Sequence, residues 1–240
     1  GVQTCALPIF AFPNYVQART NLGNTYSALN RLDDAISCYE KSISIKPDFP
    51  LAYFNLGVIH FQKKELTKAI ESYEKGIQLN PKYFEAHNNL GIAFQFFGKM
   101  DLARDCYKKA ISIKPNFLDA QINLGVILTE MGKLSEAKSC LRKAISIDSG
   151  SAKAHNSLGN VLKDQGSLME AESAYKRAIE IQPNFAMAFN NLGIVSYANG
   201  NLDDSIKSLK KAYSIKPESK LLLSVIGAKK SLSKSTSSSP

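Results

Sequence analysis

The dipeptide Leu-Gly recurs every 34 residues along this chain, and no insertion or deletion interrupts six successive periods. The glycines of these periods are Gly23, Gly57, Gly91, Gly125, Gly159 and Gly193. A fixed period of this length is typical of a solenoid, in which each unit buries its apolar face only against its neighbours. We therefore expect an elongated array of repeats, whose function depends on the surface that the repeats expose.

Each period predicts two helices. In the third period, apolar residues spaced three and four apart predict a first helix through Leu90 and Phe94 and a second through Tyr107. Gly98 lies between them, where a left-handed backbone conformation is easy only for glycine. Pro115 follows the second helix and cannot continue it. The sequence therefore predicts an all-α fold with helices of about 12 to 14 residues in antiparallel pairs.

Within each period, with the glycine counted as position 8, several other positions hold residues of similar size. Position 20 holds Ala35, Ala69, Ala103, Ala137, Ala171 and Ser205, and position 24 holds Tyr39, Tyr73, Tyr107, Leu141, Tyr175 and Leu209. The small residues predict a close approach of the paired helices. We interpret the tyrosines as packing residues that fill the space between repeats.

The pattern divides the chain into six predicted repeats with flanking segments. The repeats are 16–49, 50–83, 84–117, 118–151, 152–185 and 186–219. Residues 10–15 lead into them, apolar residues in 220–228 predict a capping helix over the last repeat, and the Ser/Lys-rich residues 229–240 are expected to be disordered. Residues 1–9 resemble a translated sequencing adapter, so we expect the natural N-terminus and any targeting signal to be missing from this fragment.

The charge and the apolar runs exclude several classes of function. The formal net charge is +9, but four lysines and no acidic residue follow Glu218, and many other cations lie late in the second helices, where they offset the helix dipole. We therefore expect a solvated helical face and no binding of nucleic acid. No apolar run reaches the ~18 residues of a membrane span.

The reactive side chains do not form a motif for catalysis or metal binding. Cys38, Cys106 and Cys140 share position 23, and no C-x-x-C or Cys/His spacing occurs. We expect reduced thiols, as in a cytoplasmic protein, and no metal or cofactor. None of the three histidines, His60, His87 and His155, is paired with a cysteine or an acid in motif spacing, and we expect no enzymatic activity.

The residues that recur resemble the tetratricopeptide repeat over residues 16–219: Leu-Gly at positions 7 and 8, alanine at 20 and 27, tyrosine at 24 and proline at 32. Local departures are Ser42 and Gly76 at position 27 and Asp148-Ser149-Gly150 in place of a proline turn. The resemblance implies a right-handed superhelix of helix pairs, with the first helices lining a concave groove that binds protein or peptide partners.

Asparagine recurs at position 6, where helix propensity does not explain it. Position 6 holds Asn21, Asn55, Asn89, Asn123, Ser157 and Asn191, and further asparagines nearby are Asn24, Asn88, Asn156, Asn160 and Asn190. In the family this position faces the groove. An amide both donates and accepts hydrogen bonds, and helices stacked at roughly 10 Å match about three residues of an extended chain. The sequence thus predicts an asparagine ladder that binds peptide backbone.

Alternatives to this interpretation remain. The position-6 asparagines could instead bond a neighbouring helix as part of the scaffold. The ladder is also similar to that in the repeat arm of O-linked N-acetylglucosamine transferases, so the repeats could be the substrate-recruiting arm of a larger modifying enzyme whose catalytic domain lies outside this fragment. RNA binding by a related helical repeat is disfavoured, because position 6 hardly varies between repeats.

Overall fold

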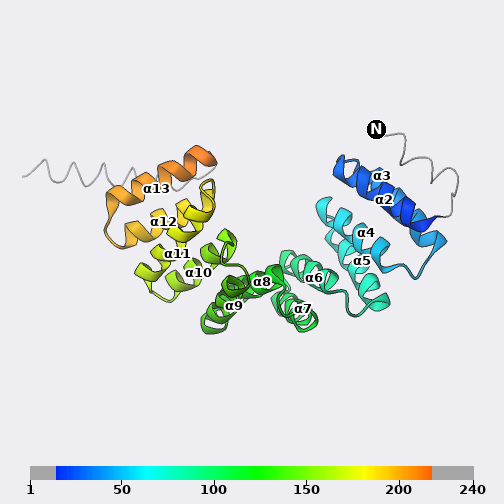
Figure 1. The fold of residues 1–240 in the computed structure, drawn as a ribbon, viewed down its shortest axis with the longest axis horizontal. Coiled ribbons are helices and arrows are strands. Elements are labelled where there is room, and N and C mark those ends of the chain that lie inside the picture. Colours follow the sequence, from blue (N-terminus) through cyan, green and yellow to red (C-terminus); the bar gives the residue numbers. More distant parts are fainter. Residues whose placement is uncertain (1–14, 218–240) are drawn as a thin grey trace, which may run out of the picture. The chain divides into compact units, whose positions relative to one another are not determined.

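The computed structural model describes residues 15–217, which are all-helical and contain no strand (Figure 1). The helices are α2 (Val16–Ala28), α3 (Leu32–Ile45), α4 (Pro50–Gln62), α5 (Leu66–Leu79), α6 (Phe84–Phe96), α7 (Met100–Ile113), α8 (Leu118–Glu130), α9 (Leu134–Ile147), α10 (Ala152–Asp164), α11 (Leu168–Ile181), α12 (Ala186–Ala198) and α13 (Leu202–Ile215). The first helix of each repeat has 13 residues and the second has 14, as predicted. The predictions for 1–9, 220–228 and 229–240 lie outside the described residues.

The described residues separate into two compact units, which divide between Ala120 and Gln121. In the first unit, α2 packs on α3, α4 on α5 and α6 on α7, and α3 and α5 also pack on the first helices of the next repeats, α4 and α6. The second unit repeats this order, with α10 packed on α11 and α12 on α13. These contacts confirm the predicted solenoid of helix pairs.

The glycine at position 8 makes room for the aromatic ring at position 24 of the same repeat. A Cβ atom added at Gly57 would lie 2.7 Å from Cδ1 of Tyr73, and one added at Gly159 would lie 2.5 Å from Cε1 of Tyr175. Carbon atoms do not approach so closely without displacement, so only glycine allows these rings to lie on the first helix. The predicted close approach of the paired helices is confirmed.

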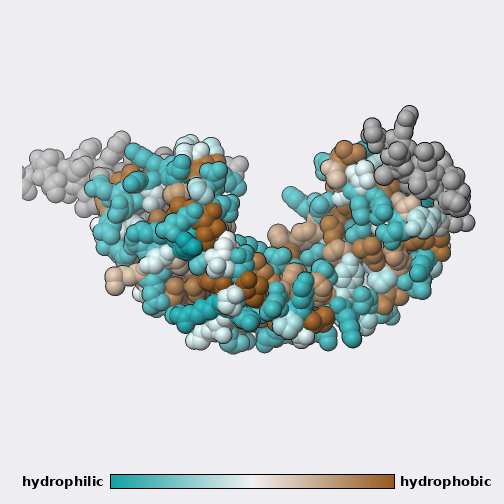
Figure 2. Space-filling model, viewed as in Figure 1, coloured by the Kyte–Doolittle hydropathy of each residue, from teal (hydrophilic) through white to brown (hydrophobic). Residues whose placement is uncertain are grey.

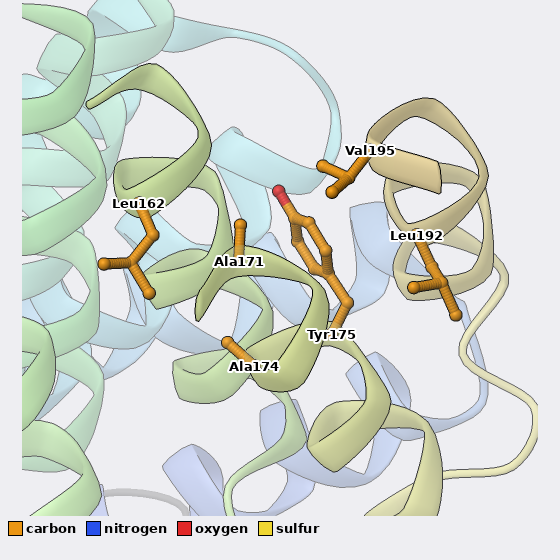
Figure 3. Packing of buried hydrophobic residues seen from close by; sticks show 6 residues of the cluster. All are labelled: Leu162, Ala171, Ala174, Tyr175, Leu192 and Val195. Carbon is orange, nitrogen blue, oxygen red and sulfur yellow. The ribbon is translucent and has the colours of Figure 1, made fainter. Parts of the chain in front are cut away.

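The same tyrosines also contact the following repeat. The ring of Tyr175 from α11 packs in one cluster with Leu192 and Val195 of α12 and with Leu162 of α10 (Figure 3). This ring has no exposed surface. Position 24 therefore joins the two helices of its own repeat and holds the next repeat against them.

The turn between paired helices requires a left-handed residue at position 15. Gly98 has a φ of 77° there, whereas Lys64 in the second repeat has a φ of 63°. Except for α9, which Asp148-Ser149-Gly150 follow, the second helices end two residues before a proline. The residue preceding Pro81, Asn80, is extended (φ −137°, ψ 89°). The predicted helix boundaries follow from these residues.

A pair of alanine substitutions tests the packing at position 8. Gly57→Ala should lower the free energy of unfolding by about 1–3 kcal/mol, because its Cβ collides with the buried ring of Tyr73. The control is Gly76→Ala on α5, where the nearest atom lies 3.4 Å from the added Cβ, an ordinary contact. There alanine should be neutral or stabilise the helix by up to about 1 kcal/mol. Urea unfolding that shows equal effects of the two substitutions would contradict this role of Gly57.

Candidate functional site

Two asparagines from successive first helices form a hydrogen-bonded pair in the first unit. The Nδ2 of Asn55 on α4 donates to Oδ1 of Asn24 on α2 over 3.0 Å. The hydroxyl of Tyr39 on α3 donates to the same oxygen over 2.7 Å. Because the Asn24 carbonyl accepts both bonds, its amide is held in one orientation.

The second unit contains the same arrangement. The Nδ2 of Asn191 on α12 donates to Oδ1 of Asn160 on α10 over 3.0 Å, and the hydroxyl of Tyr175 donates to that oxygen over 2.8 Å. Asn191 Nδ2 also donates to Oδ1 of Asn156 over 3.1 Å. Two separate pairs of repeats thus use the same three residue types in the same roles.

Each amide pair keeps unused hydrogen-bonding groups. Within the part of the chain that the structure describes, the NH2 groups of Asn24 and Asn160 have no partner, and neither do the carbonyl oxygens of Asn55 and Asn191. Asn24 is exposed and the other three are half-buried. Each pair therefore presents one donor group and one acceptor, the two groups that complement the backbone of a bound peptide.

A small cavity of about 130 Å³ opens beside the first pair. It is lined by Asn24, Ser27, Tyr39, Asn55, Val58 and Ile59. This volume corresponds to a few water molecules or one small side chain, since water occupies roughly 30 Å³. The amide pair therefore lies at an accessible hollow between α2 and α4.

The remaining ladder asparagines differ in their surroundings. Asn21 is exposed and accepts a bond from Gln17 over 3.2 Å. Asn89 is half-buried and hydrogen-bonds to the hydroxyl of Tyr73. Asn123 is half-buried, and Lys153 Nζ lies 3.4 Å from its Oδ1. These three place their amides where a ligand could reach them.

Burial limits two of the other predicted residues. Asn88 and Asn156, both at position 5, are only 4% and 3% exposed, so they present little surface to a ligand. Asn88 donates to Asn89 over 3.2 Å, and Asn156 accepts from Asn191. Asn190, at the same position in the last repeat, is half-buried. Asn88 and Asn156 therefore orient the position-6 amides.

The residue type at position 6 correlates with the residue type at position 24 of the preceding repeat. Tyr39, Tyr73, Tyr107 and Tyr175 are each followed 16 residues later by asparagine, at Asn55, Asn89, Asn123 and Asn191. Leu141 is followed by Ser157, the exception to the ladder. Leucine has no hydroxyl that needs a partner. Asn89 bonds the hydroxyl of Tyr73 directly, whereas Asn55 and Asn191 donate to the amide oxygens that accept from Tyr39 and Tyr175. The position-6 amides therefore belong to the hydrogen-bond networks of buried tyrosine hydroxyls, a scaffold role that the sequence alone leaves open.

One histidine contacts an acidic side chain. His60 Nδ1 lies 2.8 Å from Oε2 of Glu65, a contact that the search for motif spacing in the sequence did not reveal. Glu65 also contacts Lys68 at 3.3 Å and Lys63 at 3.7 Å, and its pKa is lowered mainly by the bond to His60. His87 bonds the backbone oxygen of Pro81 over 3.0 Å. The first contact spans the turn between α4 and α5, and the second joins the end of the second repeat to α6.

The structure of residues 15–217 also tests for metal sites, membrane-spanning helices and reactive thiols. No group of three or more metal-binding side chains gathers there, and none of its helices is long and apolar enough to cross a membrane. Burial raises the pKa of Cys38, and that of Cys106 to about 12, so these thiols are protonated at neutral pH.

A designed pair tests the coupling between positions 24 and 6. Leu141→Tyr alone should lower the free energy of unfolding by about 1–3 kcal/mol, because its hydroxyl would be buried without a partner. Adding Ser157→Asn should recover about 1 kcal/mol. Ser157→Asn in the presence of Leu141 is the control and should give no gain. If Ser157→Asn had the same effect on urea unfolding in both backgrounds, position 6 would not depend on the tyrosine hydroxyl.

Comparisons by sequence and by structure agree on the kind of repeat. A family model described as TPR repeat matches residues 23–64, 59–95, 125–166 and 159–200, and models described as tetratricopeptide repeat match 84–117 and 187–219. No curated protein matches the chain significantly by sequence.

Solved structures share the fold. YrrB, described as a TPR protein with an unusual peptide-binding site, is 22% identical with a TM-score of 0.63, and the match covers 78% of this chain and 97% of YrrB. PilW, a type IV pilus biogenesis factor, is 19% identical with a TM-score of 0.79 and coverages of 88% and 98%. MamA is 26% identical with a TM-score of 0.59 and coverages of 68% and 95%.

Proposed function

Because the chain belongs to the tetratricopeptide repeat family, it is a protein-interaction scaffold, and we propose that it binds an extended peptide through the asparagines of its first helices. The observation that carries the proposal is the pairing of amides across successive repeats, in Asn24 with Asn55 and in Asn160 with Asn191. Each pair is fixed by a buried tyrosine hydroxyl and keeps one donor and one acceptor unused.

A fixed pair of amides suits a peptide backbone better than a single mobile amide. The backbone of an extended segment offers N–H and C=O groups at regular intervals, whatever its side chains. The free NH2 of Asn24 can donate to a carbonyl of the segment, and the free carbonyl of Asn55 can accept from an N–H. Since the orientations are already set by internal bonds, little side-chain entropy is lost on binding.

The expected affinity is modest. Each amide bond to the peptide contributes on the order of 1 kcal/mol net, because water competes for the same groups. After the cost of ordering a flexible peptide, we expect dissociation constants between about micromolar and millimolar. Peptide binding has a precedent in this fold, since YrrB has a peptide-binding site. A substrate-recruiting arm of a longer modifying enzyme would use the same surface.

Aspartate substitutions separate binding from the scaffold role. In Asn24→Asp and Asn160→Asp, one carboxylate oxygen keeps accepting from the tyrosine and from the neighbouring amide, while the NH2 group is lost and the new oxygen repels a peptide carbonyl. A peptide selected from a random phage-display library on the native protein should bind the double variant at least about tenfold more weakly. The melting temperature should stay the same, because the internal bonds remain.

The matched control is Asn80→Asp, at the exposed C-terminal end of α5, where Oδ1 accepts from the backbone N–H of Lys82. It makes the same chemical change away from the first helices and should leave binding intact. Native affinity in the Asn24→Asp/Asn160→Asp variant, measured by calorimetry, would show that the free NH2 groups do not bind the peptide.

A further inference from the structure

An aromatic side chain at the end of α6 is far more exposed than its type usually is. Phe96 is 70% exposed, and its ring meets that of Phe61 on α4 edge to face, with centroids 5.3 Å apart. Phe97, the next residue, is 48% exposed. Figure 2 shows apolar surface, in brown, over the region that α4 to α7 occupy in Figure 1. Exposed aromatic residues that gather in this way mark interaction sites.

Several of these apolar residues lie on the same helix faces as the position-6 asparagines. On α6, Asn89, Ile92 and Phe96 follow one another at steps of three and four residues, so they share one face of the helix. On α4, Val58 and Phe61 follow Asn55 in steps of three. Val58 also lines the cavity beside Asn24 and Asn55. We call Val58, Phe61, Ile92 and Phe96 the aromatic row.

The carboxylates beside the turns that follow α4 and α6 form ion pairs. Asp33 pairs with Lys63 at 2.5 Å, and Asp101 pairs with Arg104 at 2.7 Å. Glu65 is bonded to His60 and Lys68.

Two lysines in the turns that follow α4 and α6 have no carboxylate partner among the described residues, namely Lys64 and Lys99. The Lys99 ammonium lies 5.2 Å from the centroid of the Phe97 ring. The aromatic row is thus bordered by surplus positive charge, which complements an acidic partner.

We propose that the aromatic row binds an aromatic or large aliphatic side chain of an extended peptide segment, and that Lys64 and Lys99 bind acidic residues beside it. This proposal rests on the proposed function, in which Asn24 and Asn55 of the same unit bind the backbone of that segment. Phe61 and Phe96 provide an apolar contact that the amides lack, so they give the scaffold a sequence preference. The partner is therefore a segment in which a large apolar residue is flanked by aspartate or glutamate.

Selection from a random phage-display library on the native protein tests the preference. We expect the selected peptides to be enriched in aromatic or large aliphatic residues next to aspartate or glutamate. Phe96→Ala should weaken binding of such a peptide at least about tenfold without lowering the melting temperature, because the side chain is mostly exposed. Lys64→Gln combined with Lys99→Gln should weaken binding several-fold and reduce its dependence on salt. The matched control is Met169→Ala on α11, where an 81% exposed apolar residue lies on a second helix.

The outcomes separate this proposal from the one on which it rests. If Phe96→Ala binds normally while Asn24→Asp does not, the aromatic row is overturned and backbone binding by the amides stands. If Phe96→Ala loses binding while Asn24→Asp and Asn160→Asp do not, the amide proposal fails and the aromatic row stands as the docking site. Selected peptides without the apolar and acidic residues overturn the aromatic row. A library that yields no binder overturns both proposals.

Discussion

The contact between the glycine at position 8 and the large side chain at position 24 is the constraint on which the rest of the structure depends. It brings the two helices of a repeat together and buries a ring such as Tyr73, which lies on Gly57 with 2% exposure. The same ring then supports the next repeat, as Tyr175 supports Leu192 and Val195. A large side chain at one position therefore couples packing within a repeat to packing between repeats.

Burying a tyrosine ring also brings in a hydroxyl that must be satisfied. In the first and fifth repeats the hydroxyl donates to an asparagine carbonyl, and that carbonyl also accepts from the first helix of the next repeat. Scaffold and recognition roles are thus compatible, because they use different atoms of the same amides. Asn24 supports the fold through its oxygen and offers its NH2 to a peptide.

The sequence predicted the helices closely, because glycine, alanine and proline at fixed positions determine where helices approach and end. It did not predict which amide atoms bond within the scaffold and which stay unpaired. This depends on Tyr39 and Tyr175, which lie 15 residues from Asn24 and Asn160. Serine replaces asparagine at position 157, in the repeat that follows Leu141, and this exception indicated the link between position 24 and position 6. The His60–Glu65 contact spans a turn and has no motif spacing, so the sequence did not predict it. The sequence also did not predict the exposure of Phe96, because an apolar residue in a helix is usually interpreted as part of the core.

A double-mutant cycle on Tyr175 and Asn160 measures most directly whether the buried tyrosine holds the amide. Tyr175→Phe keeps the ring and removes the hydroxyl, Asn160→Ala removes the acceptor, and urea unfolding gives the free energy of each variant. We expect a favourable coupling of about 1 kcal/mol between the two residues. Effects that add to within about 0.3 kcal/mol, as expected for independent sites, would show that the 2.8 Å contact does not tie the amide to the core.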